Sequence, residues 1–74
     1  MIEQISSRTS TLSLVPVRTG LWRVLNHSGA VLGHIERLTD ADGDRFCARR
    51  LVFASRMISL GIFCRLDDAT DCFR

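Results

Sequence analysis

All ten basic residues of this 74-residue chain are arginines, and these are the side chains most able to support binding chemistry. Arginine is preferred over lysine for bidentate contacts with phosphate, guanine and carboxylate groups. Codon bias in a GC-rich genome nevertheless explains the absence of lysine more simply than a binding role does. Eight aspartates and glutamates leave a formal net charge of +2, so the chain is far from polybasic.

The three cysteines, Cys47, Cys64 and Cys72, are an odd number and include no Cys-x-x-Cys pair. This pattern indicates neither a complete disulfide framework nor a zinc ribbon, and it favours reduced thiols in the cytoplasm. His27 and His34 could join them around a metal, but the cysteine spacing matches no common structural zinc pattern. We therefore expect no metal site and no cofactor.

Residues 40–44 alternate carboxylates in the manner of a calcium-binding loop. Arg45 stands where such a loop needs a glycine, and Leu51 stands where it needs a bidentate glutamate. A solvated acidic hairpin is the better interpretation of this segment.

Two further groups of residues raise the question of catalysis. Cys47 and His34 could form a nucleophile and a base, but nothing in the sequence supplies an oxyanion hole. Asp67, Asp68 and Asp71 cluster near the C-terminus, and the first turn of a helix is where structural carboxylates belong. We therefore expect no catalytic residues and no enzymatic activity.

Length and composition predict one small folded domain, because hydrophobic residues at 46% and charged residues at 24% are ordinary for a globular chain. We assign residues 18–74 to a single domain. Residues 1–17 hold polar and β-branched residues and include Pro16, so they are expected to form a flexible arm or at most an edge strand. No stretch resembles a signal peptide or a bilayer span, which predicts a cytoplasmic protein with no membrane partner.

Strand-like runs occupy residues 21–25, 31–38 and 45–50. Turn signals separate them, first at residues 26–29 and then at the Asp-Gly step within residues 40–44. The three runs predict an antiparallel sheet in meander order.

The C-terminal third is expected to cover this sheet. Residues 66–73 begin with an acidic turn and place Ala69 and Phe73 at helical spacing, which predicts a short helix docked through those two side chains. Residues 51–60 also carry apolar side chains at helical spacing, and Gly61 is a plausible helix stop, so one or two helical turns are expected there. The predicted fold class is α+β, with a three-stranded antiparallel sheet packed on a short C-terminal helix in the order β-β-β-α.

Period-two alternation assigns two faces to the sheet. The apolar face consists of Trp22, Val24, Val31, Ile35, Phe46 and Ala48. The polar face consists of Arg23, His34, Glu36, Arg45, Cys47 and Arg49. Gly33 belongs to the apolar face, where the missing side chain would let Trp22 or a covering helix approach the backbone.

Several short motifs carry a resemblance: Trp22-Arg23-Val24, Gly29, Val31-Leu32-Gly33-x-Ile35, Phe46-x-Ala48-x-Arg50, Leu60-Gly61-x-Phe63 and Leu66-Asp67-Asp68-Ala69-x-Asp71. Over residues 20–74 the chain resembles small actinobacterial proteins of uncharacterised function, built as a three-stranded sheet with a C-terminal helix. The resemblance implies a fold and a source, and no site residues. More remotely, the architecture is similar to the plant ethylene-response domain and the arm-binding domain of tyrosine integrases, which lay an arginine-bearing sheet into the DNA major groove.

Two classes of function follow from the polar face. A protein-binding or self-associating module is favoured narrowly, with Leu21, Leu25, Leu32 or Leu38 as the contacting side chains. The alternative is DNA binding through Arg23, Arg45 and Arg49, with His34 beside them, because neighbouring strands hold such groups about 5 Å apart. The partner itself is not identified by the sequence.

Overall fold

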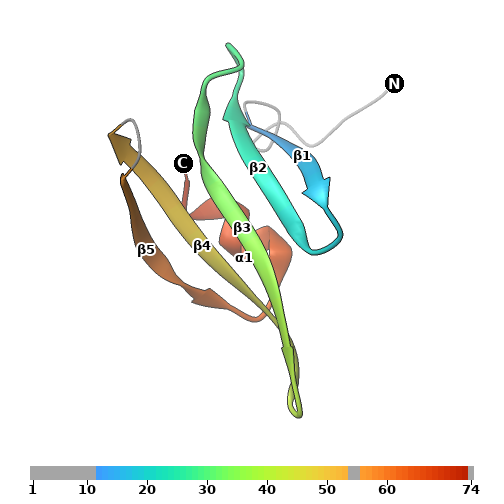
Figure 1. The fold of residues 1–74 in the computed structure, drawn as a ribbon. Helices are drawn as coiled ribbons and strands as arrows, with labels where there is room; N and C mark the ends of the chain where they lie inside the picture. The colour runs from blue at the N-terminus through green and yellow to red at the C-terminus, as the bar shows by residue number, and fades with distance from the viewer. Residues whose placement is uncertain (1–11, 54–55, 74) are drawn as a thin grey trace.

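The computed structural model describes residues 12–53 and 56–73 as an antiparallel sheet with one short helix (Figure 1). The elements are β1 (Leu12–Arg18), β2 (Leu21–Asn26), β3 (Val31–Asp40), β4 (Gly43–Phe53), β5 (Arg56–Phe63) and α1 (Leu66–Asp71). Each strand pairs with the next along the chain, so the sheet order is β1-β2-β3-β4-β5. The expected three-stranded sheet is therefore wrong, and the described part of the chain is mostly β.

The largest error concerns residues 51–60, where helical turns were expected. β4 continues to Phe53 and β5 starts at Arg56, so the described residues on both sides of positions 54–55 are strand. A short run of apolar residues satisfies helical and strand spacing equally well, whereas branched and aromatic side chains such as those at 51–53 favour a strand. Gly61 lies inside β5 with a φ of 145°, and it ends no helix.

The N-terminal segment supplies the other additional strand. Leu12–Arg18 forms β1 at the sheet edge, where the missing N–H of Pro16 is tolerated. The pairing of β1 with β2 shifts between Pro16 and Arg18. Residues 1–11, the remainder of the expected arm, lie outside the described residues.

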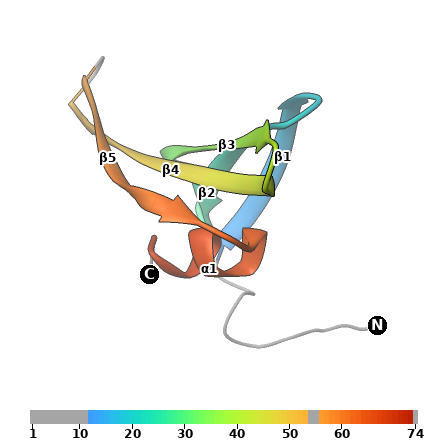
Figure 2. The same cartoon turned by 90° about the horizontal axis from the view of Figure 1, so that it is seen from below.

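The sheet curls around α1, which packs beneath β4 and β5 on the concave side (Figure 2). Val24, Ile35 and Ala48 are fully buried there, and α1 adds Ala69 while Phe73 follows directly behind it. The expected docking of the helix through Ala69 and Phe73 is confirmed. Burial of this kind holds a six-residue helix that would not persist alone in water.

Most of the predicted apolar face lines this core. Trp22 and Phe46 pack against it with their ring centroids 6.0 Å apart. Val31 is the exception: a register shift pairs it with Leu25, and its side chain is exposed. Leu32 packs against the core.

Gly33 allows the closest approach in the core. A Cβ atom at this position would overlap the Arg49 carbonyl oxygen and would lie 2.8 Å from Cε1 of Phe73. The expectation that a covering element approaches the backbone of Gly33 is confirmed, and Phe73 is the side chain that does so.

Candidate functional site

The face of the sheet turned away from α1, called the convex face here, carries a row of three basic side chains. Arg23 on β2 pairs with His34 on β3, and His34 pairs with Arg49 on β4. We call Arg23, His34 and Arg49 the cation row. Val15 and Ser59 occupy the next register positions at its two ends, so no further charge extends the row across the sheet.

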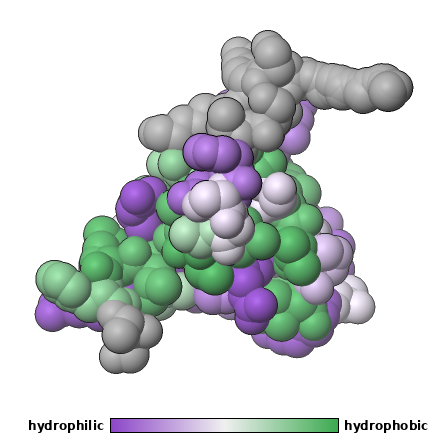
Figure 3. Space-filling view, turned by 90° about the horizontal axis from the view of Figure 1, so that it is seen from above, coloured by the Kyte–Doolittle hydropathy of each residue, from purple (hydrophilic) through white to green (hydrophobic). Residues whose placement is uncertain are grey.

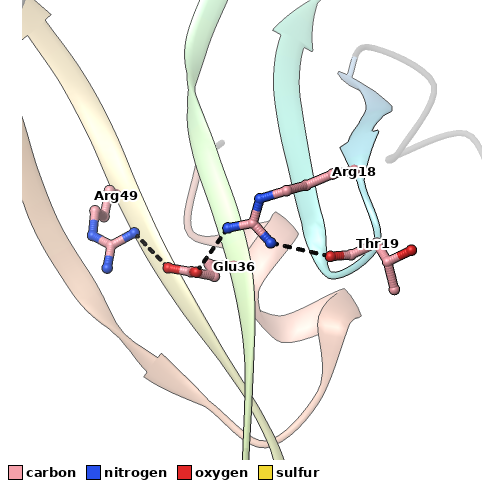
Figure 4. Close-up of polar contacts among 4 residues, drawn as sticks. All are labelled: Arg18, Thr19, Glu36 and Arg49. Atoms are coloured by element: carbon pink, nitrogen blue, oxygen red, sulfur yellow. Dashed lines mark hydrogen bonds and ion pairs between the residues drawn. The ribbon is translucent and has the colours of Figure 1, made fainter.

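Glu36 is the acidic counterpart of this row (Figure 4). Its carboxylate accepts a hydrogen bond from Nη1 of Arg49 at 3.3 Å and another from Nη2 of Arg18 at 3.2 Å. Arg18 also donates to the carbonyl oxygen of Thr19. Glu36 therefore offsets part of the positive charge of Arg49 and ties the end of β1 to β3.

Arg45, the fourth residue expected on this face, is engaged elsewhere. Its guanidinium forms ion pairs with Asp40 at 3.8 Å and with Asp42 at 3.7 Å, both in the β3–β4 hairpin. Thr39 closes the same hairpin by donating a hydrogen bond to Asp44 at 2.8 Å. The structure thus brings three of the four expected residues together and leaves Arg45 with the acidic hairpin.

The electrostatics of the row centre on His34. Partial burial lowers the pKa of this imidazole below its usual value of 6.5, and the positive charges of Arg23 and Arg49 lower it further. Within residues 12–53 and 56–73, Arg23 has no hydrogen bond or ion pair with a carboxylate. Among the described residues, the row therefore presents one guanidinium without a carboxylate partner, beside a histidine whose protonated form is disfavoured.

A second candidate surface lies where β4 and β5 extend beyond α1. At 1.5 Å per residue α1 is about 9 Å long, whereas the eleven residues of β4 span about 36 Å. The helix therefore cannot cover the whole strand. Val52, Phe53 and Ile58 are 39%, 74% and 43% exposed, and we call them the apolar end. Figure 3 shows hydrophobic residues gathered at this projecting end of the molecule.

The apolar end continues into an unprotected sheet edge. β5 is an edge strand, contains no proline, and has Arg56 as its one charged residue. Ile62 further along the strand is 59% exposed. β5 has a register shift near Leu60, a second near its start and the terminal Arg56, whereas β1 has a shift, a terminal arginine and also Pro16, which cannot donate a backbone hydrogen bond.

The leucines expected to form a protein interface are distributed differently. Leu21 and Leu25 are half-buried, and Leu38 is exposed near the β3–β4 hairpin. Leu32 is half-buried and packs against the core.

Two features of these surfaces were missed from sequence. The contact between Arg18 and Glu36 depends on the pairing of β1 with the sheet, and the sequence left open whether this segment is an arm or an edge strand. The apolar end was taken for helical turns, although the consecutive branched and aromatic residues Val52 and Phe53 are a strand signal.

The cysteines differ in environment and are all free thiols. Cys47 is buried and Cys64 is exposed. Cys72 is half-buried and donates to the carbonyl oxygen of Ala69 at 2.9 Å, and burial raises the pKa of its thiol. In the described residues, no three His, Cys, Asp or Glu side chains are grouped to hold a metal ion.

No helix in the described part of the chain has the length and apolarity needed to cross a membrane. Comparison of the sequence with models of known protein families and with curated proteins, and of the fold with solved structures, finds no significant match.

Proposed function

We propose that this protein is a non-enzymatic binding module that associates with protein, and first of all with a second copy of itself, through the apolar end and the free edge of β5. The observation that carries the proposal is the exposure of Val52, Phe53 and Ile58 together at one end of the molecule. Contiguous exposed apolar residues mark interaction surfaces more often than singly scattered ones do. No pocket of ligand size opens on the described surface, which favours a surface partner over a small molecule.

The free edge of β5 supplies the polar part of the contact. As an edge strand, β5 has alternate backbone N–H and C=O groups without a strand partner among the described residues. Strand addition at such an edge satisfies these groups by main-chain hydrogen bonds. The same contact would cover Ile58 and Ile62, which adds apolar burial to the hydrogen bonds.

Charge favours a second copy as the partner. An antiparallel pairing of two β5 strands across a two-fold axis places the first residue of one strand beside the last residue of the other. Arg56 begins β5, whereas exposed Asp67 and Asp68 lie just beyond its end, in the first turn of α1. Arg65, which lies between the end of β5 and these carboxylates, already forms an ion pair with Asp67 at 4.0 Å. The pairing therefore brings Arg56 of each copy toward Asp68 of the other, which has no ion pair among the described residues.

Nucleic-acid binding by the convex face is the second candidate. The observation in its favour is the alignment of Arg23, His34 and Arg49, with Arg23 lacking a carboxylate partner in the described residues. Against it stand the pairing of Arg45 with the acidic hairpin and the carboxylate of Glu36 within the face. For either function we propose the cytoplasm, where three unpaired thiols would persist.

Sedimentation equilibrium over a range of about 5 to 500 μM protein tests the proposed self-association, because weak dimers dissociate within this range. We expect wild type to dimerise, and the double variant Phe53→Ser, Ile58→Ser to remain monomeric with an unchanged circular-dichroism spectrum. Val17→Ser is the matched control, since Val17 is an exposed apolar residue on the opposite edge strand. A wild-type protein that stays monomeric at the highest concentration would exclude the proposal.

A further inference from the structure

The cation row combines three basic groups from three neighbouring strands in a geometry suited to one anion. Arg23 and Arg49 stand on either side of His34 at consecutive register positions. Adjacent strands lie about 5 Å apart, so the two guanidinium-bearing positions are separated by about 10 Å. Long arginine side chains reach inward over that distance, and an oxyanion above His34 would be within reach of both.

We propose that Arg23, His34 and Arg49 form a binding site for a tetrahedral oxyanion of the phosphate class, with His34 as its proton-controlled member. This site is separate from the β5 surface on which the proposed self-association rests. It gives the second candidate function a defined chemistry, because a phosphate group is either a free ion or part of a nucleic-acid backbone. Guanidinium groups bind such oxyanions by paired, charge-assisted hydrogen bonds.

The groups that face His34 determine how protons and anion interact. Arg23 lies on β2 and Arg49 lies on β4, and both disfavour a charged imidazole. Glu36 is the acidic group of the same face, two residues along β3, and it is bound to Arg18 as well as to Arg49. β1 and β5 contribute the uncharged Val15 and Ser59 at the ends of the row.

A bound anion reverses the effect of the two arginines on His34. Without an anion, partial burial lowers the pKa of the imidazole, and the positive charges of Arg23 and Arg49 lower it further. With an anion in place, the net local charge falls and protonation becomes favourable. Since linkage is reciprocal, protonation of His34 must then tighten anion binding, so affinity rises as pH falls.

Glu36 acts as an internal competitor for the site. Its carboxylate occupies the same Nη1 of Arg49 that an oxyanion would use. Glu36→Gln keeps the shape of the side chain and removes the charge, so it should free Arg49 for the anion. A merely structural role for Glu36 would predict no gain in affinity from this substitution.

The test is an NMR titration of the His34 imidazole with sulfate, at constant ionic strength set by chloride. Sulfate is the probe because its charge is constant between about pH 5 and 8, unlike that of inorganic phosphate. In wild type we expect sulfate to raise the pKa of His34, and sulfate affinity to increase about tenfold as His34 becomes protonated, a typical coupling between two sites.

Variants distinguish sulfate binding at the cation row from a general effect of surface charge. Arg23→Ala should abolish the response to sulfate, and Glu36→Gln should strengthen it severalfold. Arg45→Ala is the matched control, since Arg45 is held by Asp40 and Asp42 and should leave the response unchanged. Circular dichroism establishes that each variant is folded.

A parallel titration with a short DNA duplex distinguishes the two sources of phosphate. Responses to both probes would assign the site to a nucleic-acid backbone, and a response to sulfate alone would assign it to a small oxyanion. A His34 titration that is the same with and without either probe would overturn the proposal. Neither result depends on whether the protein dimerises, because self-association is read separately by sedimentation.

Discussion

The two halves of β4 both contain apolar side chains, but these side chains pack into the core in one half and are exposed in the other. Phe46 and Ala48 lie in the half that α1 and the neighbouring strands cover, and Ala48 is fully buried. Val52 and Phe53, further along the same strand, are exposed. The difference arises from length, since a six-residue helix is too short to reach the end of an eleven-residue strand. In the covered half apolar residues build the core, whereas in the uncovered half they remain available to a partner.

This comparison predicts opposite responses to the loss of an aromatic ring. Phe73→Ala should lower the free energy of unfolding by about 3–5 kcal/mol, because it empties the space that Phe73 fills beneath the sheet. Phe53→Ala should change it by less than about 0.5 kcal/mol in dilute solution, because the ring is exposed. Urea unfolding at low protein concentration measures both. Equal losses in the two variants would mean that the apolar end is covered within the monomer.

A smaller loss of stability is expected from a substitution at Gly33, where the backbone of the sheet contacts Phe73. Gly33→Ala should cost about 1–3 kcal/mol, because the new Cβ overlaps the Arg49 carbonyl oxygen and crowds Phe73. Gly29→Ala is the matched control: no atom lies within 4 Å of its Cβ, and its cost of about 1 kcal/mol comes from a φ of 92° alone. Thermal melting compares the two, and a Gly33→Ala protein that melts above the Gly29→Ala protein would contradict the close approach of Arg49 and Phe73 to Gly33.

For the convex face, we expect an effect of pH on the free energy of unfolding through His34. The pKa of His34 is lowered in the folded protein, so the unfolded chain binds its proton more readily. The resulting stability is fully present above the unfolded value of 6.5 and is lost as pH falls from there through the lower folded pKa. Urea unfolding across this range, in chloride buffers, should show a steeper acid loss for wild type than for His34→Gln. Parallel curves for the two proteins would contradict the lowering of the His34 pKa by partial burial and by the charges of Arg23 and Arg49.

How far the sequence predicted the molecule depended on the type of signal. β2, β3 and β4 follow strong turn chemistry, with Asn26 through Gly29 and the Asp-Gly step at 42–43. Once those strands are placed, alternation puts Arg23, His34 and Arg49 on one face, and the register of the structure aligns them. Periodicity was therefore sufficient to predict that the residues of the cation row share one face.

The remaining features depended on tertiary context. β5 was missed because a short apolar run has no unique period. Residues 1–17 were expected to be a flexible arm or an edge strand, and the choice between the two depended on the pairing of β1 with β2. Val31 changed face through a register shift, which alternation alone does not foresee. The capture of Arg45 by Asp40 and Asp42 depended on the geometry of a hairpin whose existence was predicted but whose ion pairs were not.

Amide hydrogen exchange of the two edge strands at low and high protein concentration tests the central claim most directly. We predict that the outward-facing amides of Arg56–Phe63, those not paired with β4, become protected as the concentration rises from about 20 μM to about 1 mM, because pairing with a second β5 buries their N–H groups. The amides of Leu12–Arg18 on the opposite edge should exchange at the same rate in both samples. Exchange from β5 that is independent of concentration, or protection that appears at β1 in its place, would contradict the account.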